Sequence, residues 1–194
     1  MNALIQTSAP TAEPVTLEEV KWHLRIDTDD NDFVLEGMIK AAREHIEAII
    51  NRAIMSQTWC MYLENWPDDS DFIEIPYPPL QSITSIIYTD YNGTATTWTA
   101  VTYYHEDTNS EPGRVVLRYG AEWPAVTLSP LNPIAITYVA GYSDVDSVPQ
   151  SIKQAILLDV ADLYENREGL SEKEMKSLPT LMRLLAPYIV SRFK

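Results

Sequence analysis

An acidic run near the N-terminus is the first place where this chain could do chemistry. Residues 27–32 read Asp-Thr-Asp-Asp-Asn-Asp, and carboxylates at alternate positions are typical ligands of calcium. A calcium loop of this type also needs a glycine at its sixth position and a bidentate glutamate at its twelfth, where this chain has Asp32 and Met38. We therefore interpret the run as the negatively charged start of a helix and predict no metal site.

The nucleophiles and bases of the chain form no recognisable catalytic pattern. The three histidines, His23, His45 and His105, lack the spacing of zinc ligands. Cys60 lies in a strand-like stretch, which is typical of a buried, inert thiol. Neither a glycine-rich phosphate loop nor a nucleophile elbow is present. We predict that the protein is not an enzyme and binds no cofactor, although a hydrolase with paired carboxylates stays open because such pairs have no fixed spacing.

Aromatic residues are the most informative group in the chain. There are 11 tyrosines and 5 tryptophans but only 3 phenylalanines, and most of the tyrosines lie between residues 62 and 142. Tyrosine and tryptophan suit half-exposed protein interfaces, and they are also ordinary strand formers. An alternative function is therefore a non-catalytic binding module for a glycan or a host surface. That function would place Trp98, Trp123 and neighbouring tyrosines in an open groove.

Charge and hydropathy exclude several classes of protein. The net charge of −14 leaves no basic footprint of the kind that nucleic-acid-binding proteins carry. No apolar run is long enough to span a membrane, and the first 14 residues do not resemble a signal peptide. We expect a protein made in the cytoplasm, without membrane contact.

Helical patterns occupy both ends of the chain. Within residues 32–52 an apolar stripe opposes a polar face, which predicts an amphipathic helix. The stripe consists of Leu35, Ile39, Ala42, Ile46 and Ile49, and the polar face of Glu36, Lys40, Arg43, Glu44, Glu47 and Asn51. Thr16 and Glu19 have the spacing of a capping box, which predicts a short helix over residues 17–25. Helical spacing returns over residues 149–167 and, with a kink at Pro187, over residues 180–193.

The middle of the chain has the composition of short strands separated by turns. We predict strands over residues 57–63, 72–75, 82–89, 96–99, 101–105, 114–119 and 134–139. The fold class is therefore α+β: a bundle of about four helices from the two ends of the chain, with a mostly antiparallel β-insert between the second and third helices. The expected domains are a flexible N-terminal arm (1–14), a helical bundle (15–53 and 147–194) and an inserted β-domain (54–146).

An ordered set of short motifs resembles the tailed-phage head–tail connector proteins, also called adaptor proteins. The motifs are Glu13–Arg25, Ala41–Glu47, Gln57–Trp59, Pro78–Ile83, Tyr88–Gly93, Trp123–Pro124, Ala140–Tyr142, Val148–Pro149 and Tyr164–Glu168. Together they cover residues 13–168 in the family's order, and they are similar to the longer variety with a β-insert. Related proteins occur in prophages and in gene transfer agents.

The resemblance implies a structural protein of the virion neck, between head and tail. Such a protein docks as a ring of copies beneath the portal protein. It extends the channel through which DNA passes without specific binding, and it offers a platform to a downstream connector, stopper or tail protein. The C-terminal segment would then reach toward the portal, with contacts from Leu181, Leu184, Leu185, Tyr188, Arg192 and Phe193. The alternative at each of these positions is packing on the subunit's own helices.

Overall fold

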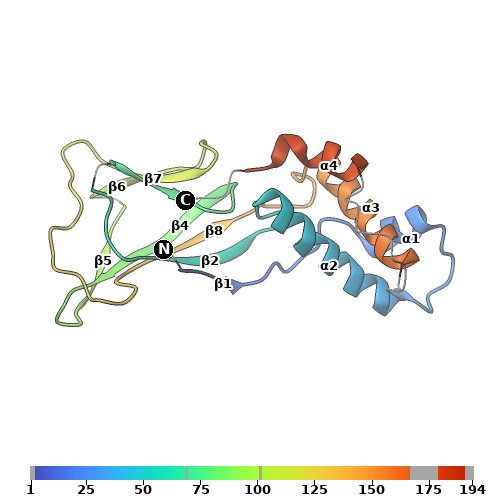
Figure 1. Ribbon diagram of the computed structural model, residues 1–194, viewed down its shortest axis with the longest axis horizontal. Helices are drawn as coiled ribbons and strands as arrows, with labels where there is room; N and C mark the ends of the chain where they lie inside the picture. Colours follow the sequence, from blue (N-terminus) through green and yellow to red (C-terminus); the bar gives the residue numbers. More distant parts are fainter. Residues whose placement is uncertain (1–2, 69, 101, 167–178, 191–194) are drawn as a thin grey trace. The chain divides into compact units, whose positions relative to one another are not determined.

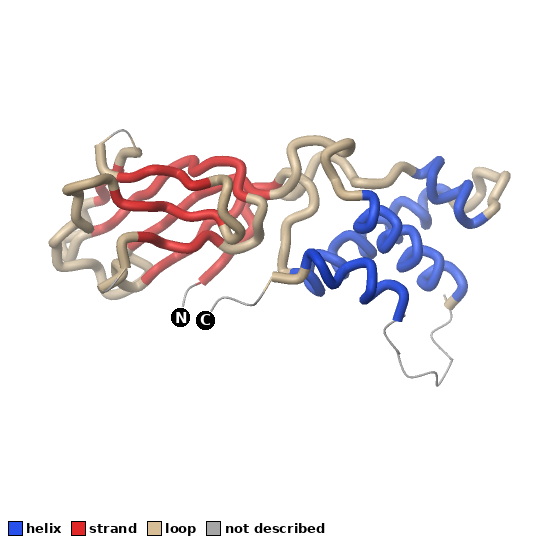
Figure 2. Tube along the Cα trace, turned by 90° about the horizontal axis from the view of Figure 1, so that it is seen from above, coloured by secondary structure: helices blue, strands red, loops and turns tan. Residues whose placement is uncertain are grey.

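The computed structural model describes residues 3–68, 70–100, 102–166 and 179–190. The chain divides into two compact units, one of residues 1–10 and 56–141 and one of residues 11–55 and 142–194. The first contains the strands and is called the β-unit here; the second contains the helices and is called the helical unit (Figures 1 and 2). Helices and antiparallel sheets together confirm the predicted α+β class.

The helical unit contains α1 (Leu17–Leu24), α2 (Asp32–Ile50), α3 (Gln150–Glu165) and α4 (Pro179–Leu185), followed by the 3-10 turn η1 (Ala186–Tyr188). The predicted capping box is present at the start of α1. The Thr16 hydroxyl accepts from the backbone N–H of Glu19 at 3.1 Å, and the Glu19 carboxylate accepts from the backbone N–H of Thr16 at 2.7 Å. None of the described helices is long and apolar enough to cross a membrane.

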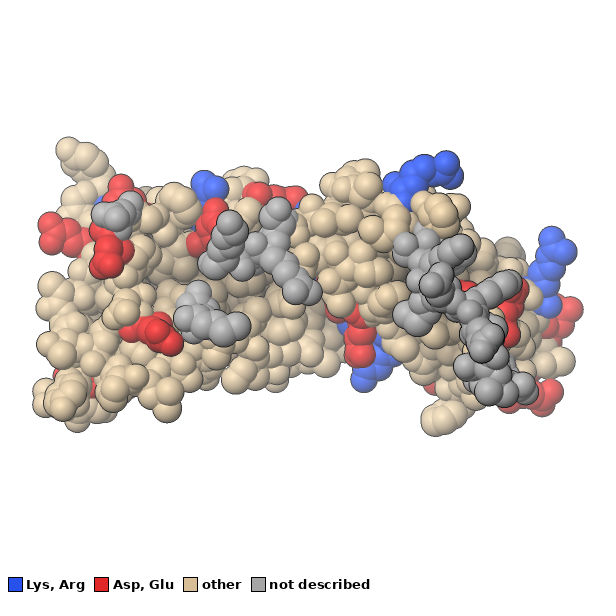
Figure 3. Space-filling model, in the orientation of Figure 1, with Lys and Arg blue, Asp and Glu red and all other residues tan. Residues whose placement is uncertain are grey.

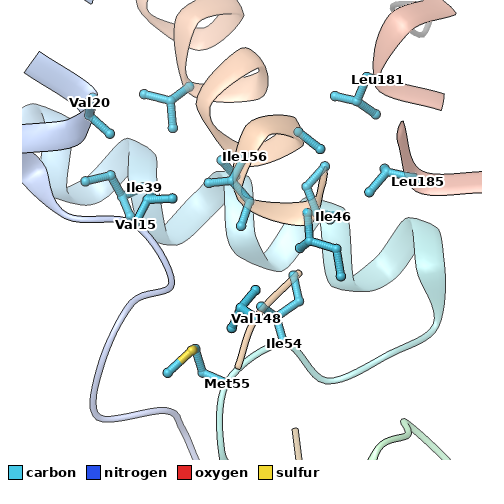
Figure 4. Packing of buried hydrophobic residues seen from close by; sticks show 14 of the residues in the cluster. Val15, Val20, Ile39, Ile46, Ile54, Met55, Val148, Ile156, Leu181 and Leu185 are labelled. Atoms are coloured by element: carbon cyan, nitrogen blue, oxygen red, sulfur yellow. The ribbon is translucent and has the colours of Figure 1, made fainter. Parts of the chain in front are cut away.

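Buried residues from all four helices meet in one apolar cluster (Figure 4). The cluster includes Val20 of α1, Ile39 and Ile46 of α2, Ile156 of α3 and Leu185 of α4. Each aliphatic side chain buried in this way contributes roughly 1.5–3 kcal/mol relative to an exposed one. The helices therefore share a single core, although the strands of the β-unit separate α2 from α3 in the sequence.

The stripe of α2 is buried largely as expected, with two differences at its edges. Ile50 is fully buried, whereas Ile49 is half-buried and packs against the cluster. Arg43, which we had assigned to the polar face, is only 2% exposed, so that assignment was wrong. Its Nε donates to Glu13 at 2.7 Å and its Nη1 donates to Glu47 at 2.8 Å.

These ion pairs explain why an arginine can be buried on this helix. Burial alone would lower the pKa of Arg43, but the hydrogen bond to Glu13 and the charge of Glu47 raise the pKa above its usual value. Glu47 also accepts from the backbone N–H of Ile54 at 2.7 Å. The network therefore fastens α2 to the segment before α1 and to the segment that follows α2. The partner from residue 13 could not be inferred from the helical period alone.

The β-unit contains two antiparallel sheets. The larger has the order β1-β2-β8-β4-β5 and the smaller has the order β3-β7-β6. The strands are β1 (Ala3–Ser8), β2 (Gln57–Leu63), β3 (Phe72–Ile75), β4 (Leu80–Thr89), β5 (Ala95–Trp98), β6 (Tyr104–Asp107), β7 (Gly113–Leu117) and β8 (Ile134–Ala140). The predicted strand at residues 101–105 is displaced, because β6 begins only at Tyr104.

The prediction of a flexible N-terminal arm was wrong for residues 3–8. This segment forms β1, an edge strand paired antiparallel with β2, with Ile5 opposite Cys60. Its short alternation gave no strong strand signal, and a pairing partner more than fifty residues away is not visible in the local sequence.

The smaller sheet lies against one face of the larger sheet. Gly113 in β7 is so close to Leu80 in β4 that a methyl group added at Gly113 would lie 2.4 Å from the Leu80 Cβ. Glu106 of β6 accepts from the backbone N–H of Ile83 at 3.0 Å. The side of the larger sheet that carries Leu80 and Ile83 is therefore its inner face. Figure 1 shows β6 and β7 beside the larger sheet.

Candidate functional site

The C-terminal segment of the helical unit is the first candidate site, because the resemblance assigns the portal contact to it. α4 presents Leu181 and Leu185 to the shared core, where they are 4% and 0% exposed. Leu184 and Tyr188 are half-buried and pack against the same core. Arg192 and Phe193 lie outside the described residues. The described part of the segment thus packs on its own helices, and the portal contact stays a prediction.

The end of this segment is held by the C-terminal end of α2. The backbone N–H of Val190 donates to the carbonyl of Ile50 at 2.9 Å, and the Asn51 side chain donates to the carbonyl of Val190 at 3.0 Å. Arg52, which is buried, donates from Nε to the carbonyl of Tyr188 at 3.2 Å. The chain is therefore fixed in place up to Val190, immediately before the residues that would have to reach a partner.

Exposed aromatic residues of the helical unit lie near the α1–α2 connection. Trp22 is 80% exposed and Phe33 is 89% exposed. Lys21 ties the two helices together, with its Nζ 2.5 Å from Asp29 and 2.9 Å from Asp32. The hydrogen bond to Asp29 raises the pKa of Lys21, and the same bond lowers the pKa of Asp29. Sequence reasoning missed Phe33, although an aromatic residue opposite the apolar stripe of α2 was a usable signal.

Three of the four tryptophans of the β-unit lie together, and two of them, Trp66 and Trp98, are buried. Trp66 stacks on Trp123 with ring centroids 5.2 Å apart, and Trp98 lies 5.4 Å from Trp66. Trp98 also stacks on Tyr104 at 5.1 Å and is only 3% exposed. A glycan-binding groove needs ring faces open to solvent, and Trp98 has none to offer. This cluster therefore acts as an apolar core between the two sheets.

The β-unit has few positive charges available for an anionic ligand. Its sequence holds 10 acidic residues, 2 arginines and no lysine, a net charge of −8. Arg118 donates from Nε to the carbonyls of Ala100 at 3.0 Å and Tyr104 at 3.2 Å. Arg114 lies 3.4 Å from Glu74 and stacks over the ring of Phe72. Figure 3 shows acidic side chains spread over one face of this unit.

Among the described residues, no group of three histidine, cysteine or acidic side chains is placed to hold a metal ion. The residues of the former calcium candidate are used in other ways: Asp29 and Asp32 both pair with Lys21.

A family model described as phage gp6-like head-tail connector protein matches residues 14–112. The chain belongs to this family. The match covers the helical segment with α1 and α2 and continues through β2 to β6 of the connector. It confirms the family resemblance found in the sequence motifs. No curated protein matches the connector sequence.

Solved structures show the same fold over nearly the whole chain. A chain in the neck of an empty gene transfer agent particle, computed with C6 symmetry, is 22% identical with a TM-score of 0.81, covering 99% of this chain and 97% of that one. A chain in the neck of the native particle, computed with C12 symmetry, is 23% identical with a TM-score of 0.77, covering 99% and 97%. A third, in the virion of the native particle, is 22% identical with a TM-score of 0.76, covering 98% and 97%.

Proposed function

We propose that this protein is a structural, non-enzymatic component of the virion neck. It docks as a ring beneath the portal, extends the DNA channel and provides the platform for a tail or stopper protein. The observation that carries the proposal is the match to the head-tail connector family over residues 14–112, supported by a shared fold with neck proteins of a gene transfer agent particle. The symmetry used for those necks supports a ring.

The charge of the chain supports a role beside passing DNA. DNA-binding proteins gain affinity when lysine and arginine neutralise phosphates. The β-unit lacks lysine, and both of its arginines are held by protein partners. A channel lined by such units would weakly repel the phosphate backbone of DNA and would not bind it. DNA therefore passes the connector without specific binding.

Electron microscopy of heads made with and without this gene product tests the proposal. We expect the mutant heads to lack density beneath the portal, and to leak DNA or remain tailless. Purified particles that keep an unchanged neck in the absence of the protein would refute the proposal. A complementing copy of the wild-type gene is the control, and it should restore the density.

The portal contact is a separate part of the proposal. Because Leu181 and Leu185 lie in the core, the contact would come from the half-buried Leu184 and Tyr188 together with Arg192 and Phe193. A double variant, Arg192→Glu with Phe193→Ser, should weaken binding to purified portal at least about tenfold, which corresponds to 1.4 kcal/mol.

The matched control for this charge reversal is Lys40→Glu, at an exposed position of α2. It should leave portal binding unchanged. Equal binding by the double variant and the wild-type protein would refute the assignment of the contact to this segment, while leaving the neck location intact.

A further inference from the structure

The larger sheet of the β-unit has an outer face without any charged residue. Side chains alternate along each strand, so the register assigns them to faces. Met61, Ile136 and Ile86 lie opposite one another on neighbouring strands, and their buried side chains point to the inner face. The residues directly before and after them in each strand therefore point to the outer face. One outer row runs Ile5, Cys60, Thr137, Ser85, and the next runs Ala3, Tyr62, Ala135, Ile87, Thr97.

This composition is unusual for a sheet face that is not covered within its own unit. Antiparallel sheets with one wet face usually alternate apolar residues with polar and charged ones. Here every outer-face residue of the five strands is aliphatic, tyrosine, cysteine, serine or threonine. Ile5 is 52% exposed and Ile87 is 36% exposed, so these apolar side chains remain open. A face that is free of charge and carries exposed aliphatic side chains is a candidate for protein binding.

We propose that this outer face binds the β-unit of a second copy of the chain and forms the contact between neighbours in the ring. The inference rests on the proposed function. Neighbouring copies in a ring must touch, and their charge limits where they can do so. Each β-unit carries a net charge of −8, so two copies repel each other wherever their acidic surfaces meet. The uncharged face is the one broad surface of the described sheets where a second copy can approach without that penalty.

A ring contact is heterologous, so the neighbour must present a different surface. The best-matched surface is the loop between β7 and β8, which exposes Tyr119, Val126 and Leu131. Backbone hydrogen bonds fix this loop beside the end of β4: Tyr91 donates to Thr127 at 2.9 Å and Ser129 to Thr89 at 3.0 Å. An apolar loop held in a defined shape can lie against a flat sheet face at a small loss of entropy.

The size of the face predicts how strongly it binds. Five strands spaced about 4.8 Å apart, with about seven residues each at about 3.3 Å, give a face of roughly 550 Å². A stable pair of proteins buries about 800 Å² on each partner. The face alone is therefore too small for a permanent dimer, and the contact becomes stable when a template such as the portal holds the copies side by side at high effective concentration.

Site-specific photo-crosslinking in assembled particles tests the contact. The photoreactive amino acid replaces Thr137 at the centre of the outer face or, as the control, Thr108 at the exposed turn between β6 and β7. We expect adducts of two copies from position 137, with the linked peptide mapping to residues 118–133, and at least tenfold fewer from position 108. Particles that contain the protein but give no self-adduct from position 137 would overturn the inference. Particles that lack the protein would instead overturn the proposed function and the inference with it.

Charge substitution supplies an independent test on the full-length protein. Ile5→Lys and Thr137→Lys place a lysine on the face, whereas Thr108→Lys adds the same charge elsewhere on the β-unit. Ile5 lies on an edge strand, where lysine is well tolerated, so this variant should stay folded by circular dichroism. We expect both face variants to lower the number of copies per particle at least tenfold and Thr108→Lys to leave it unchanged. Full incorporation of a folded Ile5→Lys protein together with the Thr137→Lys protein would overturn the inference.

Discussion

The helical unit and the β-unit carry their charges in different ways. The helical unit holds 12 of the 14 basic residues with 18 acidic ones, and several form local pairs such as Lys21 with Asp32. It even buries charged side chains, such as Arg43, which pairs with Glu13 and Glu47. The β-unit has almost no positive charge and leaves a whole sheet face neutral. The helical unit thus pairs some of its charges internally, while the β-unit keeps its acidic residues off one broad sheet face.

The two units therefore form their cores differently: the helical unit buries charged side chains along with apolar ones, whereas no described buried residue of the β-unit is charged. A buried ion pair stabilises little relative to an apolar replacement, but it is strongly destabilising when one partner is removed. The β-unit avoids this vulnerability, because none of its described buried residues carries a charge. We therefore expect charge-removing substitutions to have their largest effect in the helical unit and steric substitutions to have theirs in the β-unit.

The largest expected effect is that of Arg43→Ala. The change removes the arginine from Glu13 and Glu47, and the expected loss lies toward the lower end of about 3–5 kcal/mol because Glu13 is partly exposed and Glu47 keeps the backbone N–H of Ile54. Urea unfolding, monitored by the helical circular dichroism signal, measures this loss in the free energy of unfolding. Lys40→Ala on the same helix is the control, with an expected change within about 0.5 kcal/mol. A similar stability of both variants would show that the ion-pair network does not hold the helical unit together.

Gly113→Ala should produce the second-largest effect, and in the β-unit. The added Cβ would lie 2.4 Å from the Cβ of Leu80, so the two sheets must move apart. Overpacking of this kind destabilises by about 1–3 kcal/mol. Hydrogen exchange should show faster exchange in β4 and β7, with the helices unaffected.

Gly37→Ala offers a control for this steric prediction, because nothing lies within 4 Å of a Cβ at that position. Replacing glycine by alanine within a helix is favourable, so this variant should be as stable as the wild type or slightly more stable. Unchanged exchange in β4 and β7 of the Gly113→Ala protein would contradict the close packing of the two sheets.

Thr16→Ala should have a smaller effect on the helical unit. Loss of the threonine hydroxyl removes one half of the capping box of α1, which is worth about 0.5–2 kcal/mol. Thr16→Ser keeps the hydroxyl and should restore most of the stability. If the serine and alanine variants unfold at the same urea concentration, the cap contributes nothing.

The sequence predictions were correct where the interacting residues are near in the sequence and were wrong where they are far apart. The capping box at Thr16 and the stripe of α2 are local patterns, so they were predicted correctly. Burial of Arg43 depends on Glu13, thirty positions away, and β1 depends on a distant partner strand. Neither follows from periodicity. The family motifs, by contrast, identified the connector family before any of these contacts could be known.

The C-terminal segment and the outer sheet face could not be assigned from the sequence for the same reason. The family resemblance assigned Leu181 and Leu185 to a contact with a partner, yet an apolar segment in a sequence does not show whether it faces a partner or the subunit's own core. The outer face of the larger sheet is assembled from strands that are far apart in the sequence, and its lack of charge emerges only when the register aligns Ile5, Cys60 and Thr137.

The smallest expected effect is that of Tyr138→Phe in the core of the β-unit. The Tyr138 hydroxyl is buried and has no hydrogen-bond partner among the described residues. Removing an unpaired buried hydroxyl should leave stability unchanged or raise it by up to about 1 kcal/mol. Burial also raises the pKa of Tyr138 above its usual value near 10.

The raised pKa fixes the sign of the pH dependence. Above about pH 10 the unfolded chain releases the phenolic proton while the folded chain retains it, so wild-type stability falls as the pH rises, by at most about 1.4 kcal/mol per pH unit from this group. Tyr138→Phe should lose less stability than the wild type between about pH 9 and 11, as measured by urea unfolding at each pH. Tyr104, whose pKa is also raised by burial, titrates in both proteins, so the difference between them isolates Tyr138. Parallel pH profiles would show that the Tyr138 hydroxyl is not held in an apolar environment.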